Sequence, residues 1–201
     1  LLGERVRVPM QSADGKADIS YRHNMQNLRD AIRAVADIPT RLAADQTIIA
    51  IVDSSQSMER TDPADLRKAA LLMMIDTLDD TTALGLVDFD HQASLLSVPV
   101  RLGSFNSSNR QRLKSLVASI DSAGSTDIAA GLATAAGQVP SDGSQVTLVL
   151  LTDGRDPHWK GQPGDLPAGV AVHTIALSDQ ADQDGLGKLA TATNGILEIA
   201  R

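Results

Sequence analysis

The chain of 201 residues contains no cysteine, only four aromatic side chains and no long apolar run. Without cysteine it cannot form a disulfide framework, a thiolate nucleophile or a zinc–thiolate site. No apolar run approaches the ~20 residues that a membrane-spanning helix needs. Apolar residues nevertheless make up 42% of the chain, so we expect a core built from Ala, Leu, Ile, Val and Met.

Basic residues are also outnumbered, with 18 Lys and Arg against 25 Asp and Glu and a net charge of −7. This balance argues against nucleic acid or an anionic membrane surface as a partner, because both attract basic patches. It suits a site that holds a cation. The sequence does not indicate an oligomeric state.

Strand-like and helix-like segments alternate from residue 47 onward. Strands are predicted at 47–53, 83–89, 93–100, 145–153, 170–177 and 195–200, and helices at 61–78, 107–120, 126–139 and 181–193. The alternation predicts an α/β domain over 47–201, with a doubly wound, mostly parallel six-stranded sheet and helices on both faces. Pro99 and the short link at 90–92 predict a hairpin that ends in an antiparallel edge strand.

Residues 1–46 fall outside this alternation and are expected to form an N-terminal extension or the tail of a preceding domain. Within them, Met25, Leu28 and Ile32 have helical spacing, which predicts a helix over 24–38. Pro39 would end that helix.

Two of the predicted buried strands end in an aspartate, Asp53 in "TIIAIVD" and Asp153 in "QVTLVLLTD". Ligands of open parallel sheets bind at the carboxyl ends of the strands, where the strand order reverses. If these strands are neighbours, the two carboxylates converge and repel unless a cation or proton lies between them. Ser55, Ser57 and Thr126 add hydroxyl oxygens. Hard divalent cations prefer such oxygen ligands, so the sequence predicts a Mg²⁺ site.

The segments "IVDSSQSM", "GSTDIAAGL" and "LVLLTDGRD" resemble those of von Willebrand factor type A domains, over about residues 46–200. The resemblance implies a metal-ion-dependent adhesion site formed by Asp53, Ser55, Ser57, Thr126 and Asp153. In this family the site usually binds Mg²⁺, with Mn²⁺ or Ca²⁺ as substitutes, and an acidic side chain of a partner protein often completes the coordination. The expected function is therefore an adhesion or scaffolding module, not an enzyme.

Four residues near the predicted site are candidates for partner contacts: Gln56, Asp127, His158 and Trp159. Gln56 stands where the family usually has glycine, and it is not a ligand position. Trp159, six residues after Asp153, has two interpretations. It is either an exposed aromatic anchor at the rim of the site or a ring that folds over the sheet edge into the core.

Two alternatives remain open at this point. "VDFDH" resembles the start of haloacid-dehalogenase-type phosphatases, with Asp88 as nucleophile and Asp90 as acid and base, but Gln92 departs from that pattern. A metal-free structural module is the other, favoured by Gln56. The Ala- and Asp-rich composition suggests a bacterial source, and we expect an extracytoplasmic or surface-associated protein, with a cytoplasmic location as the alternative.

Overall fold

A computed structural model describes residues 46–62, 64–142, 144–178 and 180–200. The strands are β1 (Thr47–Asp53), β2 (Ala83–Phe89), β3 (Ala93–Arg101), β4 (Val146–Thr152), β5 (Ala171–Ala176) and β6 (Leu197–Ile199). The helices are α2 (Met58–Thr61), α3 (Leu66–Thr77), α4 (Ser108–Ala118), α5 (Ile128–Ala136) and α6 (Gln183–Ala192). In these described ranges no helix is long and apolar enough to cross a membrane.

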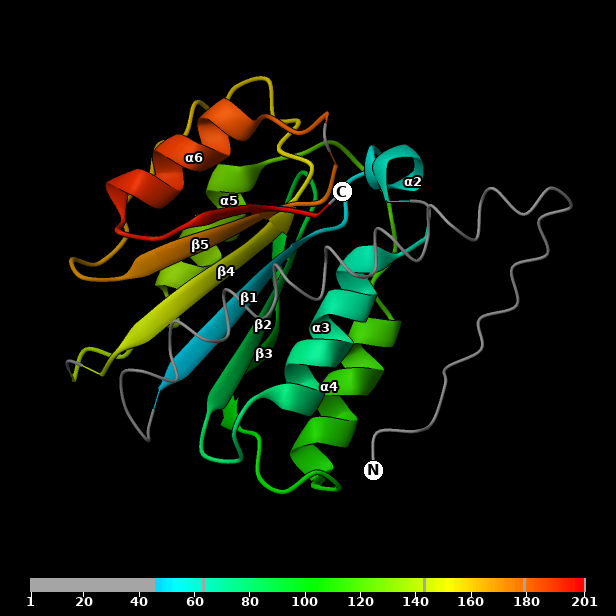
Figure 1. Cartoon of the computed structure of the whole chain (residues 1–201), viewed down its shortest axis with the longest axis vertical. Helices are drawn as coiled ribbons and strands as arrows, with labels where there is room; N and C mark the ends of the chain where they lie inside the picture. The colour runs from blue at the N-terminus through cyan, green and yellow to red at the C-terminus, as the bar shows by residue number, and fades with distance from the viewer. Residues whose placement is uncertain (1–45, 63, 143, 179, 201) are drawn as a thin grey trace, which may run out of the picture.

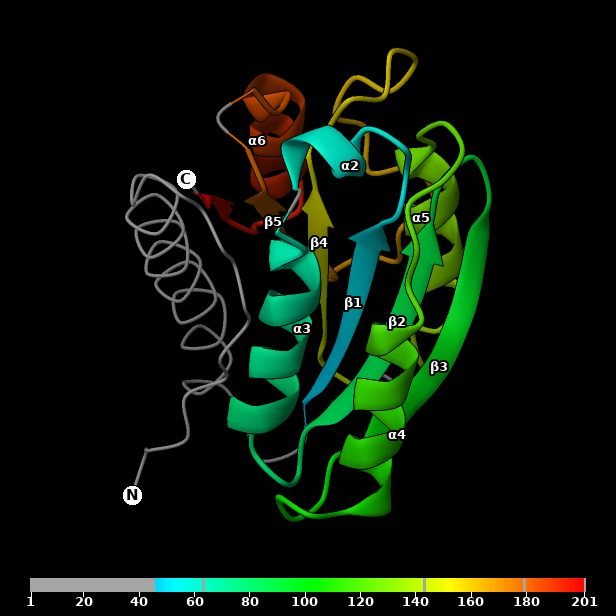
Figure 2. The ribbon, with the colours of Figure 1, turned by 90° about the vertical axis from the view of Figure 1, so that its right-hand side faces the viewer.

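The sheet has the strand order β3-β2-β1-β4-β5-β6. β1 lies parallel to both β2 and β4, and β3 is the antiparallel edge strand beside β2. The predicted doubly wound sheet and its hairpin are therefore confirmed. The two strands that end at the aspartates are neighbours, which is the condition for their carboxylates to converge. Because the chain leaves β1 toward β2 and later returns to β1's other side as β4, the strand order reverses between β1 and β4. Both strands point toward α2 (Figure 2), which places the predicted site at this end of the sheet.

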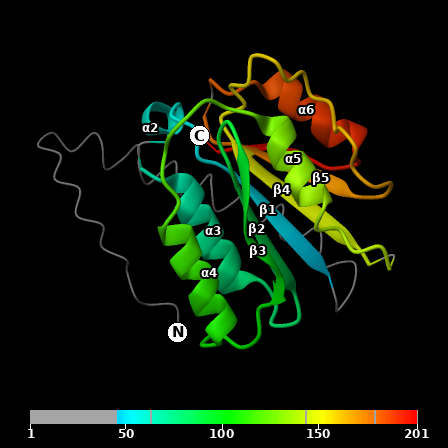
Figure 3. The ribbon, with the colours of Figure 1, turned by 180° about the vertical axis from the view of Figure 1, so that it is seen from behind.

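Helices cover the sheet on two faces. α3 and α4 lie on one face (Figure 1), and α5 lies across the other face in the view from behind (Figure 3). Side chains of β1 alternate between the two layers: Ile48, Ala50 and Val52 pack toward α3 and α4, whereas Ile49 and Ile51 pack toward α5 and α6. β1 is thus buried on both sides, which explains its nearly continuous β-branched sequence.

The helix predicted over 61–78 is interrupted. α2 ends at Thr61, and α3 begins only at Leu66. Asp65, just before α3, has a left-handed backbone with φ 51°, which a continuous helix does not allow. The start of α3 is capped by Asp62, whose carboxylate accepts hydrogen bonds from the backbone N–H groups of Leu66 (2.6 Å) and Arg67 (3.0 Å).

The other predicted elements occur at their expected places, with ends that shift by up to three residues. Residues 154–169 contain no helix or strand, as predicted. The helix predicted over 24–38 and almost all of the proposed N-terminal extension lie outside the described residues.

Candidate metal centre

Asp53 is the last residue of β1 and is fully buried, with 0% exposure. Its Oδ1 accepts a hydrogen bond from the Ser55 backbone N–H (2.8 Å), and its Oδ2 accepts one from the Thr152 hydroxyl. The pKa of Asp53 is raised to about 6, chiefly by burial and to a smaller extent by the charge of Asp153, against the lowering effect of the hydrogen bonds. The two strand-ending carboxylates therefore interact, as the register of β1 against β4 requires.

The two predicted serine ligands lie in the turn between β1 and α2. Ser55 is fully buried, Ser57 is half-buried, and their hydroxyl oxygens are 3.0 Å apart. Gln56 between them is exposed, and its backbone N–H donates to the Gly124 carbonyl (3.0 Å). Among the described non-glycine residues only Asp65 and Asn194 have positive φ. The turn therefore does not need the glycine that the family usually has at position 56.

Thr126 lies in the loop between α4 and α5, which is hydrogen-bonded to the serine turn. The Ala123 N–H donates to the Ser54 carbonyl (2.8 Å), which adds to the bond between Gln56 and Gly124. Gly124 has φ 69°, and a Cβ there would lie 2.8 Å from an Asp90 carboxylate oxygen. The left-handed backbone at this position favours glycine. Thr126 is thus held next to the turn that carries the serine ligands.

Asp153 follows β4 and is also fully buried. Its Oδ2 accepts a hydrogen bond from the Thr61 hydroxyl (2.8 Å), and its Oδ1 accepts one from the Arg155 backbone N–H (3.1 Å). The Arg155 side-chain Nε lies 3.9 Å from Oδ2. The sequence analysis missed Thr61 and Arg155. Thr61 lies eight residues after Asp53 in the separate short helix α2, so its contact with Asp153 depends on the break between α2 and α3.

A pocket of about 550 Å³ opens at this edge of the sheet, and the predicted ligands Ser57 and Thr126 line it. Asp53, Ser55 and Asp153 have 0% exposure. The structure therefore brings all five predicted ligand residues to one place, with two hydroxyls reaching the pocket and two carboxylates buried.

The donor set fits a hard divalent cation. Two buried carboxylates balance a charge of +2, and hydroxyl oxygens complete a set with no imidazole or thiolate. No basic side chain of the described residues lies within ion-pair distance of Asp53, so this part of the protein provides no counter-ion for its charge. No three His, Cys, Asp or Glu side chains gather in a metal-binding arrangement in the described part of the chain. A cation at this edge would therefore depend on the hydroxyls as well as the two aspartates.

Asp156 is a further residue that the sequence analysis did not single out, although it lies in the segment "LVLLTDGRD". It is buried, and its Oδ2 accepts from the Ile128 backbone N–H (3.1 Å) at the start of α5. Its Oδ1 accepts from the N–H groups of His158 (2.9 Å) and Trp159 (3.1 Å). Asp156 thus joins the loop after Asp153 to the helix that follows Thr126.

The candidate partner contacts differ in exposure. Gln56 and His158 are exposed, and Asp127 is half-buried and caps α5 through the Ala130 N–H (2.9 Å). Trp159 is only 4% exposed and packs in the core under α5 and α6. Its indole N–H donates to the Gln162 carbonyl (2.9 Å). The rim interpretation of Trp159 is therefore wrong, because the backbone bonds from Asp156 turn the ring inward.

Asp88 lies near the end of β2, and Asp90 lies in the hairpin turn that follows it. Asp88 Oδ1 is buried without a hydrogen-bond partner among the described residues, and burial raises the pKa of this carboxyl. Asp90 closes the hairpin turn by accepting from the Gln92 N–H (2.8 Å), and it pairs with His91 (2.9 Å). This geometry gives the phosphatase alternative no support.

Comparison with known proteins agrees with this architecture. The family model for the von Willebrand factor type A domain matches residues 48–155, so the chain belongs to this family. It is 33% identical over 159 residues to calcium-activated chloride channel regulator 1 of Mus musculus, covering 75% of this chain and 17% of that protein. Membership in the family indicates a protein-interaction module.

Solved structures share the fold. The von Willebrand factor type A structure from Catenulispora acidiphila has a TM-score of 0.63 at 23% identity, covering 79% of this chain and 39% of that one. An aerotolerance-related membrane protein from Bacteroides fragilis has a TM-score of 0.60 at 18% identity, covering 77% and 90%. The chain spans less than half the length of the curated relatives it matches.

Proposed function

We propose that this domain is a protein-binding module that depends on a divalent cation, most readily Mg²⁺, and captures an acidic side chain of a partner protein. The observation that carries the proposal is that Asp53, Ser55 and Asp153 are buried at the same sheet edge where Ser57 and Thr126 line a pocket. A bound cation would supply an electrophilic position for a partner's carboxylate.

Each ligand residue has a role that follows from its surroundings. Asp53 and Asp153 provide the negative charge, and the hydroxyls of Thr152 and Thr61 hold their carboxylates in place. Ser57 and Thr126 reach the pocket, so they lie on the side from which a partner would approach. We propose no catalytic activity for this site.

The relatives' names support an extracytoplasmic or surface-associated setting. They include a membrane protein of Bacteroides fragilis and a minor pilin of Streptococcus sanguinis. We extend this setting to the present chain as part of the proposal.

Thermal unfolding in Mg²⁺ tests the proposal. A ligand that binds only the folded state at one hundred times its Kd adds about 2.7 kcal/mol of stability. For a domain of this size that free energy corresponds to a Tm increase of roughly 5–10 °C. The Tm of the wild-type protein, stripped with EDTA, should rise by this amount in saturating Mg²⁺.

Asp53→Ala should remain folded and lose the response. Asp121→Ala is the matched control, because Asp121 is an exposed carboxylate that precedes the Thr126 loop and lies outside the site. It should respond as the wild type does. A wild-type Tm that does not change across millimolar Mg²⁺ and Mn²⁺ would favour the metal-free structural module instead.

A further inference from the structure

Two hollows meet beside the candidate metal centre. The first, which we name the metal pocket, is the one of about 550 Å³ described above. The second has a volume of about 530 Å³ and runs along α5, and we name it the α5 groove. Ser125, Thr126 and His158 line both, so the two hollows form one continuous surface. A partner bound at the metal pocket would therefore extend naturally into the α5 groove.

The metal pocket is lined by two exposed arginines, Arg60 from α2 and Arg155 from the loop after β4. Arg155 is held in place, since its guanidinium donates to Gln180 Oε1 (2.6 Å). Glu59 offsets part of this charge. In a chain with a net charge of −7, a pair of arginines around a predicted cation makes this hollow favourable for anionic groups.

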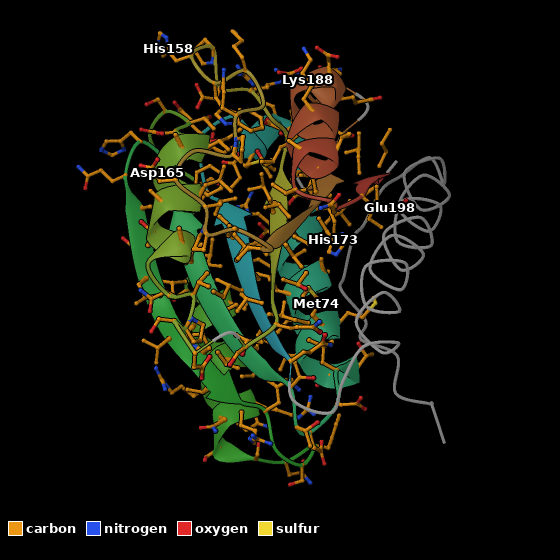
Figure 4. The ribbon with its side chains drawn as sticks, turned by 90° about the vertical axis from the view of Figure 1, so that its left-hand side faces the viewer. Met74, His158, Asp165, His173, Lys188 and Glu198 are labelled. Atoms are coloured by element: carbon orange, nitrogen blue, oxygen red, sulfur yellow. The ribbon has the colours of Figure 1, made fainter. Side chains whose placement is uncertain are left out.

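The α5 groove has the opposite character. Its floor includes the exposed Ala129 and Ala133, one helical turn apart on α5, and the buried Leu132. At its edge lies Asp165, which is exposed. Figure 4 shows His158 on the projecting loop and Asp165 beside α5 on the same side of the molecule. The groove therefore suits an apolar side chain followed by a basic one.

We infer that the partner is an extended peptide segment with a defined polarity: an acidic cluster for the metal pocket, then an apolar residue and a basic residue for the α5 groove. The inference rests on the proposed function and adds the chemistry of the partner to it. Charge complementarity supplies the direction, because a segment bound the other way round would place acids against Asp165 and a base against Arg60 and Arg155.

Binding of synthetic fluorescent peptides, measured by anisotropy in Mg²⁺, tests this inference. The matched peptide is Glu-Asp-Gly-Leu-Gly-Lys and the charge-swapped peptide is Lys-Asp-Gly-Leu-Gly-Glu, each also made in the reversed order and with one to three glycines between groups. A glycine peptide with a single Asp serves as the reference for metal capture alone. In its better chain direction and spacing, the matched peptide should bind about five- to tenfold more tightly than the swapped one.

A charge-exchanged protein provides the critical comparison. Arg60→Glu with Asp165→Lys leaves the net charge unchanged and should reverse the peptide preference. The control is Arg112→Glu with Asp79→Lys, which makes the same exchange at exposed positions of α4 and the α3–β2 loop. This control should keep the wild-type preference. Ala133→Trp should fill the α5 groove and lower the affinity for the leucine peptides to that of their glycine analogues. The increase of Tm in Mg²⁺ should stay as in the wild type.

The failures of the two ideas differ. If the single-Asp peptide binds only in Mg²⁺, and the matched and swapped peptides bind with equal affinity, the inference about the α5 groove is wrong and the proposed metal site is supported. A matched preference that persists in EDTA and reverses in the exchanged variant would support the groove and overturn the metal requirement. If no peptide binds at millimolar concentration, both ideas fail.

Discussion

α3 begins and ends beside a buried arginine, and the two arginines have contrasting surroundings. Arg110, at the end where α3 stops, directs its guanidinium at backbone carbonyls. Nε donates to the Gly103 carbonyl (2.9 Å), Nη1 to the Ile75 carbonyl, and Nη2 to the Leu78 carbonyl (2.8 Å). Nη2 also donates to the Asp80 carboxylate (2.9 Å). The last carbonyls of α3 are thus satisfied by a side chain of α4.

Arg67, at the start of α3 near the candidate metal centre, is bonded less completely. Its Nη2 donates to the Ser122 hydroxyl (2.6 Å) and lies 3.2 Å from Asp65. Its Nε and Nη1 make no hydrogen bond within the described part of the chain, and Nη1 is 3.7 Å from Asp62. The end of α3 far from the site is therefore fully bonded, whereas the end that supports the site keeps unsatisfied polar atoms.

The contrast between Arg110 and Arg67 distinguishes a contribution to the stability of the fold from a contribution to the candidate metal centre. A buried network with every donor satisfied fixes structure, whereas a partly satisfied one costs free energy and persists where it serves a site. Arg67 reaches Ser122 in the loop that carries Thr126, so it links α3 to the candidate ligands. Mutations at the two ends of α3 should therefore have different effects on folding and on metal binding.

The largest effect is expected at the fully bonded end. Arg110→Met should lower the free energy of unfolding by roughly 3–5 kcal/mol, because it removes the donor to two buried carbonyls, those of Ile75 and Leu78, and to the part-buried carbonyl of Gly103. The Kd for Mg²⁺ should not change in the folded fraction. Urea denaturation and calorimetric titration measure the two quantities, with the exposed Arg112→Met as control. A weaker Mg²⁺ affinity with unchanged stability would reverse the comparison.

The next effect concerns Asp62, whose pKa burial raises from 3.8 to about 6, against the opposing backbone hydrogen bonds of Arg67 and Leu66. The folded state then holds a proton that the unfolded state releases, so stability falls as the pH rises from 4 to 6 and stays low above that. This carboxyl should contribute no more than about 3 kcal/mol to the change.

Asp62→Asn should make that part of the pH profile less steep, and the slope that remains should include the contribution of Asp53, whose pKa is raised to about 6 as well. Urea denaturation in EDTA at pH 4.5, 5.5 and 7 measures it for both proteins. Parallel profiles for the wild type and the variant would show that Asp62 does not titrate in this range.

A smaller loss of stability is expected for Asp156→Ala, which removes the acceptor of three backbone N–H groups beside the candidate metal centre. Stability should fall by about 2 kcal/mol, and the Mg²⁺ affinity should fall as well, because the loop after Asp153 is no longer joined to α5. Asp165→Ala, which alters an exposed carboxylate of the same loop, is the control and should leave both properties intact. Lost stability with full Mg²⁺ affinity would restrict Asp156 to a structural role.

The smallest change in stability is expected for Arg67→Met, about 1–2 kcal/mol, because two of the three guanidinium nitrogens make no hydrogen bond. Its Mg²⁺ affinity should fall about tenfold, as is usual when residues that orient metal ligands are removed. Ser122→Ala should reproduce part of the affinity loss with almost no change in stability. If Arg67→Met destabilises the fold as much as Arg110→Met, the contrast between the two ends fails.

Much of this arrangement could be predicted from the sequence. The β-branched runs that end in Asp53 and Asp153 identified the central strands, and strand order then placed both carboxylates at one edge. What the sequence could not provide were contacts between distant segments. Thr61 reaches Asp153 only because the chain breaks between α2 and α3, and Asp156 caps a helix that begins 28 residues before it.

Trp159 shows the same limit in another way. A single large aromatic after a strand is compatible with an exposed rim and with a buried core. The buried position is stabilised by two hydrogen bonds: the Trp159 backbone N–H donates to the Asp156 carboxylate, and the indole N–H donates to the Gln162 carbonyl. Neither bond has a periodic signature in the sequence.

The most direct test of the account is anomalous X-ray diffraction from crystals of this protein soaked in MnCl₂, since Mn²⁺ uses the same oxygen ligands as Mg²⁺ and scatters anomalously. The account predicts one strong anomalous peak at the carboxyl edge of β1 and β4, about 2.0–2.3 Å from oxygens of Asp53, Ser55 and Ser57. The peak should be absent from Asp53→Ala crystals grown and soaked in the same way. No peak at that edge in the wild type, or a peak that survives in Asp53→Ala, would contradict the account.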